Sequence, residues 1–196
     1  MVQSVQKTYG GVSSLQADFL QESFLSALDV SEQSSGKMQF RKPGQMRWDY
    51  LKPEAQLFLI RDKVLTLFQP KENQVIRQRV EDVFLTDLPA SFIMGIGDLS
   101  RDFKLVAACD NADGVVLELS PARAASADKG DRAIKTFKLL INPSSYLPVG
   151  ARVVDVGGNS TAILFQTPKT NALIPDSTFE FTAPKGADII ERTAGE

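Results

Sequence analysis

The sequence predicts a mainly β fold with a few short helices, built on one meandering antiparallel sheet. Apolar residues alternate with polar ones along many segments, short turn signals separate those segments, and few stretches have helical spacing. With 196 residues, of which 43% are hydrophobic, the chain is long enough to bury a core without disulfides. We therefore expect a single domain that spans residues 1–196.

The chain opens with a helical pattern and then changes period. Val2, Val5 and Tyr9 recur at helical spacing, which predicts a helix over residues 2–10. From about residue 12 to residue 80 the apolar period is two, which is typical of strands with one apolar face and one solvated face.

The clearest alternation lies in two neighbouring segments. In GKMQFR the apolar positions are Met38 and Phe40, and in QMRWDY they are Met46, Trp48 and Tyr50. The intervening KPGQ predicts a turn, because proline and glycine supply its backbone geometry. These two segments therefore predict a hairpin with one apolar face.

Later segments repeat this rhythm, with two interruptions. Residues 81–97 predict two short helical pieces divided near Pro89, and residues 121–133 predict a surface loop. Strands are predicted at residues 55–61, 64–69, 73–80, 102–108, 114–120, 133–142, 149–156, 160–167 and 178–182.

Composition excludes several classes of function. The net charge is −2 without a basic stripe, which argues against a nucleic-acid partner. The chain has no histidine, which excludes Ser-His-Asp triads, Cys-His pairs and His-ligated zinc. Its single cysteine, Cys109, excludes an intrachain disulfide or a site of several thiolates, and we expect it to be a small buried hydrophobic residue.

Acid chemistry has no support in the spacing of the carboxylates. We interpret the candidate acids as solvated surface charge and expect no catalytic residue, metal or cofactor. They are Asp49, Glu54, Asp62, Glu72, Glu81 and Asp82. No stretch of 18 apolar residues predicts a membrane span, and MVQSVQKTYGG lacks the features of a signal peptide. Composition therefore allows a cytoplasmic protein or one whose signal peptide is absent from this sequence.

A sheet with one apolar face must cover that face by closing, by packing on a second sheet, or by accepting helices. The inward candidates are large, and methionine among them adapts to irregular apolar partners. They are Met38, Phe40, Met46, Trp48, Tyr50, Leu57, Leu59, Leu67, Phe92, Met94 and Ile96. From the pattern alone, such residues more often fill a core than line a cavity.

Three blocks carry a resemblance to a known family. GKMQFRKPGQMRWDYLKPEAQLFLIRDKVLTLFQPKENQVI resembles the characteristic block of the LolA family of outer-membrane lipoprotein carriers. The closing DVGGNSTAILFQTPKTNALIPDSTFEFTAPKGADIIE is similar to that family's last hairpin and its F-x-F-x-x-P-x-G-x-D ending, and LPASFIMGIGDLSRDF resembles its lid. The similarity covers residues 2 to 190.

This resemblance implies an unclosed antiparallel β-barrel whose apolar cavity is covered by a helical lid at about residues 81–97. It implies a non-enzymatic, monomeric periplasmic carrier. Such a carrier takes acylated lipoproteins from an ATP-driven release complex of the inner membrane to the outer membrane, where an acceptor lipoprotein is a partner if present. The candidates given above would then hold the acyl chains.

The family's lid latch is altered in this chain. The resemblance implies an arginine immediately before the turn proline that donates to lid carbonyls, but Lys42 stands there. Lysine keeps the charge and loses the planar fork of arginine. Arg41 or Arg47 are therefore candidates to share the latch, with solvated charge as the alternative interpretation.

Other functions remain open at the level of sequence. A same-fold acceptor lipoprotein would need a lipidated N-terminal cysteine, and none precedes Cys109. A same-fold sensor of mislocalised lipoproteins would need a second domain. A lipid hydrolase would need a base that histidine does not supply here, and a non-catalytic interaction module needs no special residue.

Overall fold

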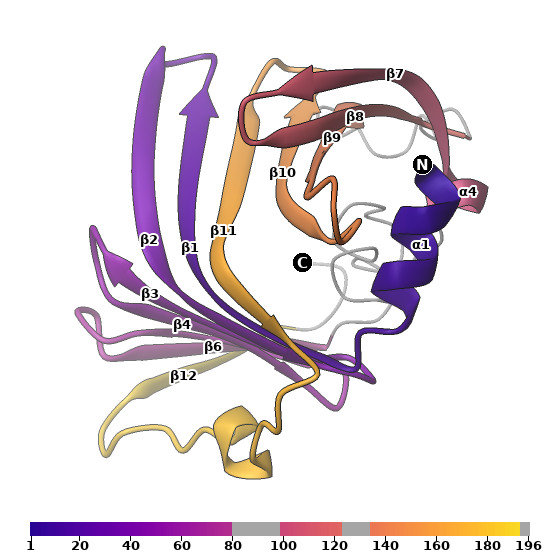
Figure 1. The fold of residues 1–196 in the computed structure, drawn as a ribbon. Helices are drawn as coiled ribbons and strands as arrows, with labels where there is room; N and C mark the ends of the chain where they lie inside the picture. Colours follow the sequence, from indigo (N-terminus) through magenta and orange to yellow (C-terminus); the bar gives the residue numbers. More distant parts are fainter. Residues whose placement is uncertain (80–98, 123–133, 193–196) are drawn as a thin grey trace. The chain divides into compact units, whose positions relative to one another are not determined.

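The computed structural model of the chain describes residues 1–79, 99–122 and 134–192 (Figure 1). Within these ranges, twelve strands form one sheet in the order β12-β6-β5-β4-β3-β2-β1-β11-β10-β9-β8-β7. Among the described residues, β12 and β7 are the two edges of that order and are not paired with each other. The prediction of a mainly β, unclosed sheet with few helices is confirmed.

The strands follow the alternating segments of the sequence closely. They are β1 (Ser14–Leu25), β2 (Val30–Arg41), β3 (Gln45–Lys52), β4 (Gln56–Arg61), β5 (Val64–Gln69), β6 (Gln74–Arg79), β7 (Phe103–Asn111), β8 (Gly114–Pro121), β9 (Ile134–Ile141), β10 (Pro148–Asp155), β11 (Ser160–Thr170) and β12 (Asp188–Arg192). The helices in the described ranges are α1 (Val2–Gly10), α4 (Leu99–Asp102) and the 3-10 turn η2 (Asp176–Phe179). No helix in these ranges is long and apolar enough to cross a membrane.

Two predicted segments lie largely outside the described residues. They are the lid at 81–97, with the cavity candidates Phe92, Met94 and Ile96, and the loop at 121–133. Both therefore stay predictions.

The end of the chain differs from the prediction. Residues 178–182 do not form a strand, and η2 and extended chain occupy this stretch instead. The last strand is β12, which pairs with β6 in parallel, with Asp188 opposite Gln74 and Arg192 opposite Gln78. The sheet is therefore not antiparallel throughout, although every other pairing with a described register is.

The described residues divide into two compact units. Unit 1 comprises Met1–Val12, Phe19–Gln33 and Gly97–Gln166, and unit 2 comprises Ser13–Asp18, Ser34–Ile96 and Thr167–Glu196. The hydrogen-bonded sheet runs through both, because β1, β2 and β11 contribute residues to each.

Unit 1 buries one face of the strands β8 and β9. Leu117 and Leu119 of β8 alternate with half-buried residues, and Phe137 and Leu139 of β9 lie opposite them in register. All four side chains are almost fully buried. The ring of Phe103 in β7 lies 5.1 Å from that of Phe137 and extends this core.

The first helix belongs to the same unit. Val5 and Tyr9 of α1 are buried one helical turn apart, as their spacing predicts. Gln6 accepts a hydrogen bond of 2.9 Å from the backbone N–H of Leu99, which fixes the start of α4 against α1. Burial raises the pKa of the Tyr9 phenol, since the phenolate would lose its solvation.

Candidate functional site

An apolar row crosses five neighbouring strands of unit 2. Met38 lies opposite Trp48, Trp48 opposite Phe58, Phe58 opposite Leu67, and Leu67 opposite Ile76. Residues directly opposite each other in antiparallel strands point to the same side of the sheet. This row therefore defines one face of unit 2, which we call the apolar face.

A second row runs beside the first. Phe40 lies opposite Met46, Met46 opposite Ile60, and Ile60 opposite Leu65. The row ends at Gln78 on β6. The apolar face thus spans β2 to β6 and is two residues deep along each of β2 to β5.

Burial along the apolar face is graded. Met38, Phe40, Met46, Trp48 and Ile60 are buried. The members further towards β6 are only half-buried, namely Phe58, Leu65, Leu67 and Ile76. Several large side chains of β4 to β6 therefore keep apolar surface available for contact.

Tyr50 continues the apolar face along β3. Its ring stacks on Trp48 with a centroid separation of 6.4 Å and an interplanar angle of 24°. Burial raises the pKa of the Tyr50 phenol, so the side chain is neutral near pH 7. The structure thus brings Met38, Phe40, Met46, Trp48, Tyr50 and Leu67 together as predicted neighbours on one face.

Leu57 and Leu59 do not belong to this face. They lie opposite Asp49 and Arg47, on the other side of the sheet, so the prediction that they share a face with Trp48 is wrong. In the segment AQLFLIR, the residues that point to either side of the strand are apolar, so the sequence does not show which side faces inward. The register with β3 shows that Phe58 and Ile60 belong to the apolar face. Phe58 and Ile60 could have been identified from the sequence by pairing β4 with β3 across the turn between them.

The opposite side of unit 2 is covered by its own chain. Leu57 and Leu59 form a buried cluster with Ile174 and Phe179, and Phe68 packs against it. Phe181 lies 5.3 Å from Phe68, ring to ring. We call residues 174–181 the strap, which lies in the yellow segment between β11 and β12 in Figure 1.

Three arginines hold the strap by its backbone carbonyls. Arg41 donates to the Ile174 carbonyl at 2.8 Å, and Arg47 donates to the Thr178 carbonyl at 3.0 Å. Arg61 donates to the Phe179 carbonyl at 3.4 Å. Arg41 also pairs with Asp176 at 2.6 Å and lies 5.0 Å from the centre of the Phe179 ring.

These contacts bear on the predicted latch. Arg41 and Arg47 bind strap carbonyls on the side of the sheet opposite to the apolar face. Lys42 lies in the turn after β2, where its backbone N–H donates to the Ser13 carbonyl at 2.9 Å. Its side chain is half-buried, and desolvation lowers the pKa of its ammonium group. The lid lies outside the described residues, so a latch at Lys42 stays a prediction.

Three of the candidate acids, Asp49, Glu54 and Asp62, form ion pairs in the structure. Arg47 donates two hydrogen bonds to Asp49, Lys71 pairs with Glu54 at 2.5 Å, and Arg61 with Asp62 at 3.4 Å. Cys109 is exposed on β7, so the prediction of a buried cysteine is wrong. β7 is an edge strand of the sheet, and most of its residues are exposed whichever side of the sheet they point to.

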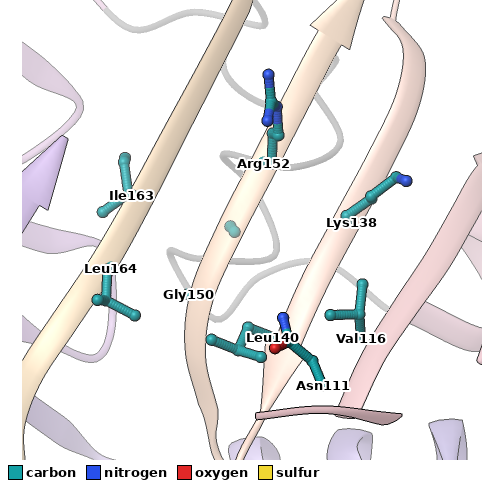
Figure 2. Close-up of a pocket in the computed structure, with 9 residues that line it drawn as sticks. Asn111, Val116, Lys138, Leu140, Gly150, Arg152, Ile163 and Leu164 are labelled. Atoms are coloured by element: carbon teal, nitrogen blue, oxygen red, sulfur yellow. The ribbon is translucent and has the colours of Figure 1, made fainter. Parts of the chain in front are cut away.

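Unit 1 contains a small hollow (Figure 2). Val116, Lys138 and Leu140 line it and alternate along β8 and β9 with the buried core residues, so the hollow lies on the other side of the sheet from that core. Its floor is Gly150, with Leu140 and Leu164 on either side and Lys138 and Arg152 further along the strands. Its volume is about 190 Å³. A cavity of roughly 150 Å³ holds one benzene-sized molecule, so this hollow is too small for a long acyl chain. None of the predicted cavity residues that the structure describes lines it.

Sequence comparison relates the chain to a defined family. Residues 10–182 match the family model described as outer membrane lipoprotein carrier protein LolA. An outer-membrane lipoprotein carrier protein of Chromobacterium violaceum is 30% identical over 92% of this chain and 82% of its own length. One of Cupriavidus pinatubonensis is 29% identical over 96% of this chain and 86% of its own length.

A solved structure shows the same fold. An uncharacterized conserved protein from Thermus thermophilus superposes with a TM-score of 0.61. The alignment covers 97% of this chain and 98% of that one at 14% identity, which supports a shared fold and no more.

Proposed function

The chain belongs to the outer-membrane lipoprotein carrier (LolA) family, and on that basis we propose that it is a periplasmic carrier of acylated lipoproteins. It receives a lipoprotein from an ATP-driven release complex of the inner membrane. It then delivers the lipoprotein to the outer membrane, to an acceptor lipoprotein where one exists. The carrier acts as a monomer and needs no metal or cofactor.

The apolar face of unit 2 is the observation that supports this proposal. Its first row joins five large apolar side chains across β2 to β6, and three of these are only half-buried. Each buried CH₂ group contributes about 0.8 kcal/mol, so a long acyl chain would gain on the order of 10 kcal/mol by leaving water. We propose that the acyl chains lie along these rows.

The proposed cavity also includes residues outside the described ranges. Phe92, Met94 and Ile96 would belong to the lid that closes over the chains. Phe58, Ile60, Leu65 and Ile76 join the proposed lining in place of Leu57 and Leu59, because the register puts them in the two rows.

We propose that the protein carries its cargo without cleaving it. Hydrolysis of an acyl ester needs a general base of suitable pKa, and the chain has no histidine to supply one. Purified protein should therefore release no fatty acid from acylated peptides. Turnover that scales with protein concentration and disappears on Asp or Glu substitution would contradict this.

The test of the carrier function is retention of cargo. Protein purified from a lipid-rich host should retain acylated cargo in native mass spectrometry. In solution it should bind a fluorescent diacylated peptide. Leu67→Gln places an amide in the first apolar row and should weaken that binding roughly tenfold, which is about 1.4 kcal/mol.

The matched control is Leu173→Gln, because Leu173 is 95% exposed and lies outside the rows. It should leave peptide binding unchanged, and thermal unfolding should show that the Leu67→Gln protein is folded. Equal binding by both variants and the parent would overturn the placement of acyl chains on the apolar face. Failure of the parent protein to bind the peptide would overturn the function itself.

A further inference from the structure

The apolar face of unit 2 ends in polar side chains on β6. Ile76 is the β6 member of the first row, and Gln78 is that of the second. Gln74 points to the same side of β6, because alternate residues of a strand share a side. All three side chains are half-buried. At β6 the face therefore consists of one apolar side chain between two neutral amides.

The next strand, β12, carries charge on either side of the first row. β12 pairs with β6 in register and is an edge of the sheet order among the described strands. Ile190 lies beside Ile76 and continues the first row, whereas Asp188 and Arg192 flank it on the same side of β12. Both charged side chains are exposed, and Ile190 is half-buried. Exposure and polarity of the face therefore increase together from β2 towards β12.

The two glutamine amides of β6 retain hydrogen-bonding capacity. Gln74 donates from Nε2 to the Asp188 carboxylate at 3.3 Å, and its carbonyl oxygen accepts no hydrogen bond from the described residues. Gln78 makes no side-chain hydrogen bond within the described part of the chain. A glutamine amide offers two donors and one acceptor. It can therefore donate to the carbonyl oxygen of an ester, and both donate to and accept from an amide.

The length of the first row fits one acyl chain. From Met38 to Ile76 the row crosses four strand spacings of about 4.8 Å, or about 19 Å. An acyl chain spans roughly half of a hydrocarbon core about 30 Å thick, which is about 15 Å. A chain whose methyl end lies at β2 therefore brings its carbonyl end next to β6.

We propose that the acyl chains lie on the apolar face with their methyl ends towards β2, and that Gln74 and Gln78 bind the carbonyl groups of the ester or amide linkages. The reverse orientation puts these carbonyls beside Met38 and Phe40, which are buried and have no donor to offer. The inference rests on the proposed function, because its ligand is the acylated cargo. It adds the orientation of the chains and the polar group that the protein recognises.

The only tryptophan of the chain can report the orientation. Trp48 lies one strand spacing from Met38 and three from Ile76 along the first row. Two diacylated peptides of equal chain length are compared, with bromine either near the methyl end or next to the carbonyl carbon. Because bromine quenches tryptophan emission only at short range, the methyl-end bromine should cause the larger loss of emission. Equal or larger quenching by the bromine next to the carbonyl would overturn the orientation.

Recognition of the carbonyl groups is tested by replacing the esters with ethers, which keep the chains and remove both carbonyl oxygens. The parent protein should bind the ester-linked peptide roughly tenfold more tightly, since two neutral hydrogen bonds are lost with the ether. Gln74→Leu/Gln78→Leu should bind both peptides equally and keep the parent's affinity for the ether. The matched control is Gln56→Leu/Gln69→Leu, because these glutamines are also half-buried but lie on β4 and β5. This control should keep the preference for the ester.

The outcomes separate this inference from the carrier function. A preference for the ester that survives in the Gln74/Gln78 variant, or disappears in the control, would show that other groups bind the carbonyls. Equal affinity of the parent for both peptides would contradict the proposal as well. In each of these cases binding of the ether-linked peptide leaves the carrier function standing. A parent protein that binds neither peptide would overturn the carrier function itself.

Discussion

Trp48 occupies the middle of the first apolar row, with Met38 opposite it on β2 and Phe58 opposite it on β4. It is the only tryptophan of the chain, and it is buried. An acyl chain along the row would replace the contacts of its ring, so we expect a shift of tryptophan emission on addition of a diacylated peptide. The measurement is a fluorescence titration, with Trp48→Phe as the control that removes the signal. An emission that stays constant and is readily quenched by iodide would put Trp48 outside the acyl site.

Whether Lys42 latches the lid is a separate question, because Arg41 and Arg47 bind the strap. If Lys42 is the lid latch, closure competes with cargo for the apolar face. A hydrogen bond from a charged donor contributes roughly 1.5–3 kcal/mol, and an arginine fork makes more of them than a lysine. Lys42→Arg should therefore weaken retention of a fluorescent acylated peptide and speed its transfer to acceptor membranes, while Lys42→Leu should do the reverse.

The control for this pair is Lys37→Leu, since Lys37 is exposed on β2 on the side of the sheet opposite the rows. It removes a lysine from the strand that precedes the Lys42 turn, and it should alter neither retention nor transfer. If Lys42→Arg and Lys42→Leu behave like this control, Lys42 does not latch the lid.

At the scale of elements, the strap is a segment without sheet pairing that three arginines fasten to β2, β3 and β4. Arg47→Met removes the donor to the Thr178 carbonyl and leaves Asp49 without its cation. Since the Arg47 side chain is only 25% exposed, we expect a loss of about 1–3 kcal/mol in the free energy of unfolding. Amide hydrogen exchange over residues 174–181 should quicken.

A matched arginine lies in the other unit. Arg101 makes its ion pair with the adjacent Asp102 and is 69% exposed, so Arg101→Met should change stability by less than about 0.5 kcal/mol. Unaltered exchange in the strap of the Arg47→Met protein would show that packing of Phe179 and Ile174 alone holds it.

The strap also shows where prediction from sequence stops. The strands β2 and β3 were predictable because Met38, Phe40, Met46 and Trp48 alternate strictly and a Pro-Gly turn separates them. The same alternation in TFEF suggested a strand at 178–182, but the strap carbonyls bind arginines instead of a neighbouring strand. That choice depends on Arg47 and Arg61, which lie more than a hundred residues away in sequence.

The inward face of a strand was predictable only where every second residue was polar. In β4 the residues on both sides of the strand are apolar. Phe58 and Ile60 belong to the apolar face, while Leu57 and Leu59 pack against the strap. A single strand of this kind does not specify its inward side, and the register with β3 decides it. The residues that share the apolar face were therefore predictable on β2 and β3 and not on β4, and the binding of acyl chains to that face stays a proposal.

At the scale of the whole molecule, two compact units share one sheet. β1, β2 and β11 each continue from one unit into the other, so their backbone hydrogen bonds are common to both. If the hydrogen bonds between strands were lost in one unit, the same strands would carry unpaired backbone groups in the other unit. Each unpaired group would cost about 1–3 kcal/mol. We therefore expect the 196 residues to unfold as one domain.

The test uses the same substitution in each unit. Leu139→Ala removes a buried leucine from the core of unit 1, and Leu59→Ala removes one from the cluster beneath the strap in unit 2. Each should cost about 2–5 kcal/mol, and both should lower the midpoint of a single calorimetric transition whose van't Hoff and calorimetric enthalpies agree. Independent units would instead give two transitions, of which Leu139→Ala moves one and Leu59→Ala the other. If the shared strands couple the two units, loss of packing in either unit destabilises the whole sheet. Only a single transition that both substitutions lower is compatible with this coupling.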